Sequence, residues 1–201
     1  MYTSAGFRYI PNLLTVARIL VTPLLLVLLT VQSPGGQASA VALFVVASLT
    51  DYYDGVLARR FQVRSRLGQY LDPLADKILV LGTFGMLSFQ EPTIVPWWAV
   101  VLIAFRDVAV TALRSWVEAG GESLQTYRVA KAKTMLQLAF LFGLLVLRFG
   151  THLSPPFREW AIWILRDTAL PGVALAGVVG FTLATGALYF VSPTQERVEV
   201  E

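Results

Sequence analysis

Long apolar stretches alternate with short polar segments along most of the chain. Six of these stretches reach the roughly 20 residues that a helix needs to cross a bilayer. The pattern predicts an all-α integral membrane protein with one membrane domain over residues 1–201. Residues 1–11 are expected to form an interfacial segment, with a frayed terminus as the alternative. The predicted spans are residues 12–31, 38–59, 68–89, 96–116, 127–149 and 170–190.

The composition also indicates a membrane protein, and it excludes several kinds of active site. Hydrophobic residues make up 56% of the chain, and the mean hydropathy of +0.64 is above the range of soluble proteins. Cysteine is absent, which excludes disulfides and thiolate chemistry. The single histidine, His152, lies far from the acidic residues considered below, which argues against a histidine-based triad or a His-rich zinc site.

The basic residues predict the orientation in the membrane. Six spans place both termini on one side, and that side receives thirteen of the 16 Lys and Arg, leaving Arg148, Arg158 and Arg166 opposite. By the positive-inside rule the termini are cytoplasmic, in the cell membrane. The net charge of +3 comes without a basic stripe interleaved with aromatics. We therefore expect anionic lipid head groups or phosphate-bearing substrates as partners, and no nucleic acid.

Four aspartates lie at the cytoplasmic ends of the second and third predicted spans. Asp51 and Asp54 are one helical turn apart, as are Asp72 and Asp76. Carboxylates at bilayer depth are costly, and four together repel one another. One or two divalent cations resolve that repulsion, and all-oxygen ligation favours Mg²⁺ or Mn²⁺ over zinc. The alternative is an ion or proton pathway in a transporter, but the acids crowd one membrane end and no inverted repeat is visible.

Residues around the aspartates suit a bound nucleotide. Gly55, Ala58 and Gly68 carry small or no side chains, which allows a bulky group to approach the backbone, although helix packing is the alternative. Arg59 carries a planar fork that matches a pyrophosphate. In the first span, Arg18 shares a face with Thr15, and a snorkelling role is its alternative.

These residues together follow the spacing D-x2-D-G-x2-A-R-x8-G-x3-D-x3-D. The pattern closely resembles the signature of the CDP-alcohol phosphotransferase family, integral membrane enzymes with six transmembrane helices. Such a match over 26 residues is highly specific. The matching residues are Asp51, Asp54, Gly55, Ala58, Arg59, Gly68, Asp72 and Asp76.

The resemblance implies a role for each matching residue. The four aspartates would hold a pair of metal ions, and Asp76 would also be the general base. The CDP group would contact Gly55, Arg59 and Ser65, the segment around Thr15, and the small residues Ala58 and Gly68. The resemblance also implies a homodimer.

Outside the signature, the chain resembles the glycerol-3-phosphate-using branch of the family. The resemblance implies transfer of a phosphatidyl group from CDP-diacylglycerol to glycerol 3-phosphate. Inositol phosphate, phosphatidylglycerol and serine are the alternative acceptors. The segments that carry it are IPNLLTVAR at 10–18, LDPLADKILV at 71–80, the Arg106-Asp107 pair, TALR at 111–114 and KAKTMLQ at 131–137.

An acceptor that carries its own phosphate needs a cationic pocket, which disfavours serine. Arg106, Arg114, Lys131 and Lys133 are the candidates for this pocket. The alternative for these residues is positive-inside charge, which accounts for part of the set. Arg106 lies deeper in its span than a topology signal needs, so we favour a site role for it.

Overall fold

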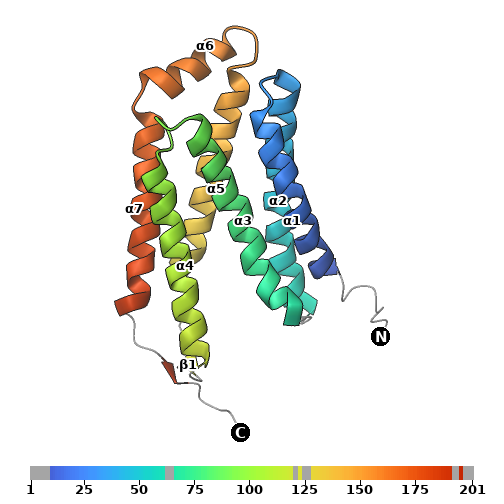
Figure 1. The fold of residues 1–201 in the computed structure, drawn as a ribbon, viewed down its shortest axis with the longest axis vertical. Coiled ribbons are helices and arrows are strands. Elements are labelled where there is room, and N and C mark those ends of the chain that lie inside the picture. Colours follow the sequence, from blue (N-terminus) through green and yellow to red (C-terminus); the bar gives the residue numbers. More distant parts are fainter. Residues whose placement is uncertain (1–9, 62–65, 120–121, 124–127, 192–194, 197–201) are drawn as a thin grey trace. The chain divides into compact units, whose positions relative to one another are not determined.

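Helices make up nearly all of the described chain. The computed structural model describes residues 10–61, 66–119, 122–123, 128–191 and 195–196. Two strands of two residues each, β1 (Glu122–Ser123) and β2 (Gln195–Glu196), pair antiparallel. The predicted all-α class is confirmed. The helices are α1 (Ile10–Thr30), α2 (Pro34–Phe61), α3 (Arg66–Gln90), α4 (Trp97–Ala119), α5 (Arg128–Gly150), α6 (Phe157–Ile162), its π-helical continuation (Trp163–Asp167) and α7 (Leu170–Val191) (Figure 1).

Six long helices occupy the stretches where the sequence predicts spans. Within the described residues, two segments are long and apolar enough to cross a membrane, Ala132–Gly150 and Leu170–Tyr189. Among the described side chains, the apolar segments of α1, α2 and α3 are shorter: Ala17–Thr30, Pro34–Thr50 and Lys77–Gln90. The number of spans therefore stays a prediction, and the predicted interfacial segment falls largely on residues 1–9, outside the described residues.

The chain divides into two compact units, with boundaries inside α3, inside α5 and just before α7. Residues 1–86 and 141–168 form the first unit. Residues 87–140 and 169–201 form the second.

A hairpin of α1 and α2 forms much of the first unit. Leu25 and Leu29 of α1 and Ala40 and Phe44 of α2 are almost completely buried. The two helices lie side by side (Figure 1). The apolar positions recur every three or four residues, which places them on one face of each helix.

The start of α2 corrects one sequence prediction. The second predicted span was expected to begin at residue 38, but the helix already begins at Pro34. Ser33 acts as the N-cap, since its Oγ accepts a hydrogen bond from the Gly36 N–H at 3.1 Å, and proline is well suited to the first helical position. The Gln37 side chain then donates to the carbonyl oxygens of Leu29 and Val31, at 3.3 and 2.8 Å. These bonds satisfy carbonyl groups at the end of α1.

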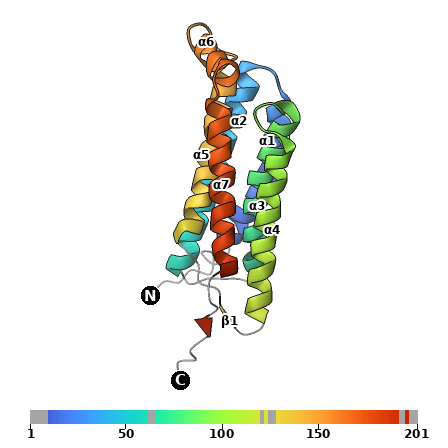
Figure 2. The ribbon, with the colours of Figure 1, turned by 90° about the vertical axis from the view of Figure 1, so that its left-hand side faces the viewer.

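The connection between α5 and α7 contains the short helix α6. Helix α6 lies across the C-terminal end of α5 (Figure 2). The approach is close at Gly150, where a Cβ atom would lie 3.0 Å from the Cβ of Ala161. Phe157, Trp160 and Trp163 are exposed at three-residue spacing along this segment.

In the second unit, α4 packs along α7 (Figure 1). Ile103 and Val110 of α4 are buried, as are Val178 and Val179 of α7. The short ladder pairs Glu122 with Glu196 and so joins the segment after α4 to the segment after α7. This unit also contains the buried polar residues described next.

Candidate functional site

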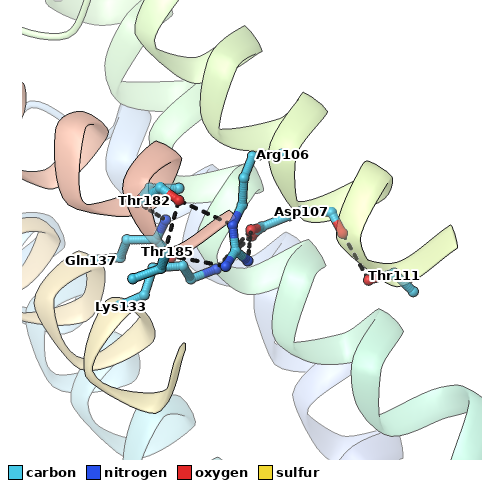
Figure 3. Close-up of polar contacts among 7 residues, drawn as sticks. All are labelled: Arg106, Asp107, Thr111, Lys133, Gln137, Thr182 and Thr185. Atoms are coloured by element: carbon cyan, nitrogen blue, oxygen red, sulfur yellow. Dashed lines mark hydrogen bonds and ion pairs between the residues drawn. The ribbon is translucent and has the colours of Figure 1, made fainter. Parts of the chain in front are cut away.

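A cluster of polar side chains is buried between three helices of the second unit. All its members are at most 9% exposed. Figure 3 shows their side chains pointing toward one another. Burying polar groups between apolar helices costs free energy unless the groups are hydrogen-bonded to one another. The presence of the cluster therefore indicates a structural or a chemical role. The members are Arg106 and Asp107 of α4, Lys133 and Gln137 of α5, and Thr182 and Thr185 of α7.

Asp107 is the shared acceptor of the cluster. Lys133 Nζ donates to its two carboxylate oxygens at 2.8 and 2.9 Å. Arg106 Nη1 donates to one of these oxygens at 3.2 Å. With their ordinary charges, two cations and one anion leave a net charge of +1. Because the charged side chains are buried and hydrogen-bonded to one another, their positions are fixed.

Arg106 is held by α7 as well as by Asp107. Its Nε donates to the Thr182 carbonyl oxygen at 3.1 Å, and its Nη2 donates to Thr185 Oγ1 at 3.2 Å. The guanidinium carbon also lies 6.0 Å from the centre of the Tyr189 ring. These bonds use three of the five guanidinium N–H donors. Within the described part of the chain, one N–H on each terminal nitrogen is left for another acceptor.

Gln137 completes the link between α5 and α7. Its Nε2 donates to Thr182 Oγ1 at 3.1 Å. Thr185 in turn donates its hydroxyl to the Thr182 carbonyl oxygen at 2.9 Å. A pre-ordered cationic cluster of this kind can bind an anion such as a phosphate group, for which arginine is especially suited.

The predicted phosphate-binding residues are brought together only in part. Arg106 and Lys133 both form ion pairs with Asp107. Arg114 lies on α4 and Lys131 on α5, but their side chains fall outside the described residues. Whether any of the four binds a phosphate stays a prediction.

Sequence reasoning missed most of the partners of Arg106. Asp107 was noted beside Arg106, but without a role. Thr182, Thr185 and Gln137 were not singled out. The signal was a pair of hydroxyls one turn apart in an otherwise apolar stretch, with Gln137 one turn after Lys133.

The aspartates lie on α2 and α3, consecutive helices that run in opposite directions (Figure 1). Asp51 precedes the end of α2 at Phe61 by ten residues, and Asp76 follows the start of α3 at Arg66 by ten. At 1.5 Å per residue, both positions are about 15 Å from the helix ends that the link joins. The four linking residues can span at most roughly 18 Å.

Asp54 and Asp72 are likewise seven and six residues from those ends. The two pairs therefore lie at similar distances along their helices from the ends that the link joins. An all-oxygen donor set of this kind fits a hard cation such as Mg²⁺. The side chains of residues 51–76 lie outside the described residues, so the ligands stay a prediction.

The side chains predicted to contact CDP also lie outside the described residues, so these contacts stay a prediction. Thr15 lies on α1, and its side chain is outside the described residues. Nearby Arg18 is described and is only 2% exposed, so it does not snorkel toward water within this chain. The remaining predicted contacts lie on α2 (Gly55, Ala58, Arg59), on α3 (Gly68) and outside the described residues (Ser65).

Comparison with known proteins identifies the family. The model of the CDP-alcohol phosphatidyltransferase family matches residues 8–180. The chain belongs to this family. Its members are membrane-associated and generally depend on a divalent metal.

Several relatives carry the same name, CDP-diacylglycerol–glycerol-3-phosphate 3-phosphatidyltransferase. The one from Bacillus subtilis (strain 168) is 30% identical over 194 residues, covering 90% of this chain and 93% of the relative. The one from Cereibacter sphaeroides is 36% identical over 160 residues, covering 77% and 71%. The one from Escherichia coli (strain K12) is 34% identical over 142 residues, covering 68% and 76%. The similarity thus extends well beyond the aspartate signature.

Proposed function

We propose that this CDP-alcohol phosphatidyltransferase transfers a phosphatidyl group from CDP-diacylglycerol to glycerol 3-phosphate in phospholipid biosynthesis. The products are phosphatidylglycerophosphate and CMP. The observation that carries the proposal is the relative from Bacillus subtilis, which has this activity in its name and aligns with 90% of the chain. A buried cluster with a net positive charge, centred on Arg106, supports an acceptor that carries a phosphate.

The proposed setting is the cell membrane, with six spans in a single domain and both termini in the cytoplasm. The charge asymmetry of the sequence supports this orientation. The aspartates would then face the compartment that contains soluble phosphorylated metabolites. Residues 1–11 would lie along the interface, and two copies of the chain would form a homodimer, as the family resemblance implies.

Asp51, Asp54, Asp72 and Asp76 would hold the metal, Mg²⁺ or Mn²⁺, as two ions. Bound there, the ions would neutralise the pyrophosphate of the CDP-lipid and stabilise the leaving CMP. The support is the donor chemistry and the similar distances of the two pairs from the ends of α2 and α3 that the link joins.

The reaction needs one proton transfer and one displacement. Asp76 would take the proton of the acceptor hydroxyl. The hydroxyl oxygen would then form a bond to the phosphorus that bears the diacylglycerol. The bond from that phosphorus to the oxygen of CMP breaks, and CMP leaves with the electron pair. Arg59 would stabilise the charge on the pyrophosphate, and the lipid tails would stay in the bilayer.

Both substrates would be held by groups around this centre. The phosphate of glycerol 3-phosphate would bind Arg106 and Lys133, supported by the two Arg106 N–H groups that no described residue accepts. Arg114 and Lys131 are the further candidates for this pocket. The CDP group would contact Thr15, Gly55, Ala58, Arg59, Ser65 and Gly68.

A direct assay separates this function from its alternatives. Purified protein is incubated with CDP-diacylglycerol, labelled glycerol 3-phosphate and Mg²⁺. The proposal expects equal amounts of CMP and phosphatidylglycerophosphate, and no product after the metal is removed with EDTA until Mg²⁺ is restored. CMP release with a different alcohol alone would point to another acceptor. No CMP release, with cation flux across proteoliposomes, would point to a transporter.

A further inference from the structure

We propose that one turn of α7, residues 182–186, is a positioning element that sets the orientation of the Arg106 guanidinium for the acceptor phosphate. The inference deepens the proposed function and rests on it. These residues would act through Arg106, with no contact to the substrate.

Two acceptors on α7 bind the same edge of the guanidinium. The Thr182 carbonyl oxygen accepts from Nε at 3.1 Å, and Thr185 Oγ1 accepts from Nη2 at 3.2 Å. Because the guanidinium is planar, two such bonds fix its rotation about the last side-chain bond. Asp107, the next residue on α4, accepts a hydrogen bond from Nη1 at 3.2 Å. The two N–H groups that have no acceptor among the described residues therefore have set directions.

Thr185 is itself held in place. Its hydroxyl donates to the Thr182 carbonyl oxygen at 2.9 Å, so its oxygen lone pairs are directed toward Arg106. Gln137 of α5 anchors Thr182 by donating to its hydroxyl at 3.1 Å. The turn thus receives its own support from a third helix.

Gly186 is what allows Arg106 to lie so close to α7. A Cβ atom at this position would lie 2.8 Å from Arg106 Cγ and 3.0 Å from Arg106 Nε. Any larger residue would push the arginine away from its two acceptors. Gly177 of the same helix has nothing within 4 Å of the corresponding point. The absence of a side chain is therefore needed at Gly186 and is incidental at Gly177.

Ordering Arg106 before the substrate arrives has a kinetic consequence. An arginine that must be immobilised on binding loses rotamer freedom, and this weakens the affinity for the acceptor. Pre-ordering removes that cost. The turn should therefore affect the KM for glycerol 3-phosphate and leave the KM for CDP-diacylglycerol unchanged.

The test compares Gly186→Ala with Gly177→Ala in the full-length enzyme in lipid-containing micelles. Both changes replace a helical glycine by alanine, so the change in helix propensity is matched. We expect Gly186→Ala to raise the KM for glycerol 3-phosphate by about tenfold or more, as for the loss of a charge-assisted bond. Gly177→Ala should leave it unchanged. Equal KM values for the two variants in an active enzyme would overturn the positioning role.

Thr185 provides a second, milder test. Thr185→Ser keeps the hydroxyl and should keep the wild-type KM for glycerol 3-phosphate, whereas Thr185→Val removes it and should raise that KM several-fold. An unchanged KM in Thr185→Val would overturn the role of the hydroxyl. A wild-type enzyme that forms no phosphatidylglycerophosphate would overturn the proposed function and this inference together, whereas equal KM values in an active enzyme affect the inference alone.

Discussion

Lys133 of α5 and Asp107 of α4 form a buried ion pair, in which the ammonium group donates to both carboxylate oxygens at 2.8 and 2.9 Å. The two side chains are 8% and 7% exposed. Asp107 also accepts from Arg106, so one carboxylate organises both described candidates for the phosphate pocket. Asp107 therefore affects both the stability of the fold and the positive charge that Arg106 and Lys133 can offer to a substrate.

Removing either member of this pair should destabilise the second unit. We expect Asp107→Ala to lower the free energy of unfolding by about 3–5 kcal/mol, because it leaves buried cations without their partner. Lys133→Met should also destabilise. The double variant should lose less than the sum of the two single losses, as measured by thermal unfolding in detergent. Additive losses would mean that the pair is not coupled.

Arg106→Ala should weaken the binding of the acceptor and leave the lipid donor unaffected. Charge-assisted hydrogen bonds contribute about 1.5–3 kcal/mol each, so the KM for glycerol 3-phosphate should rise by about 10- to 100-fold. Arg166→Ala is the control, since Arg166 is an exposed arginine of the π-helical segment. If the two variants have the same KM for glycerol 3-phosphate, Arg106 does not bind the acceptor.

Asp76→Asn should stop turnover while CDP-diacylglycerol still binds. Asparagine keeps the size of the side chain but cannot accept the proton, and a general base contributes about 10²- to 10⁴-fold. Turnover is measured as CMP release, and binding is measured by equilibrium titration with the CDP-lipid. Glu91→Gln, a carboxylate beyond the end of α3, is the matched control. Appreciable turnover by Asp76→Asn would remove Asp76 from the base role.

The first turn of α2 allows a test of the fold alone. At Gly36 a Cβ atom would lie 2.5 Å from Val31 Cγ1, whereas at Gly35 it would meet nothing within 4 Å. We expect Gly36→Ala to lower the free energy of unfolding by about 1–3 kcal/mol through this overlap. Gly35→Ala should be neutral. Equal melting temperatures for the two variants would contradict the described path of the chain between Val31 and Gln37.

The helices were predictable because each apolar stretch ends at a polar or turn-forming segment. Glu91 and Pro92 mark the end of α3, and the charged residues after Tyr189 follow the end of α7. The start of α2 was placed four residues late, because Ser33 and Pro34 look like a turn in the sequence but act as a cap and a first helical residue.

The hydrogen-bond partners within the buried cluster could not be predicted from the sequence. Helical spacing gives the face on which a residue lies, but not the helix that the face meets. Arg106 and Thr185 are 79 positions apart in the chain, and Gln137 and Thr182 are 45 apart. Gly186 gave no signal either, because its role is to leave space for a side chain from another helix. The family signature predicted the residue types of the metal and CDP sites, whose side chains lie outside the described part of the chain.

The central claim is the choice of acceptor, and a competition assay tests it most directly. Purified enzyme with CDP-diacylglycerol and Mg²⁺ is given glycerol 3-phosphate, inositol phosphate, serine and phosphatidylglycerol together at equal concentrations, and the lipid products are identified by mass spectrometry. The account predicts phosphatidylglycerophosphate as the main product, formed in step with CMP. A main product from any of the other three acceptors would contradict it.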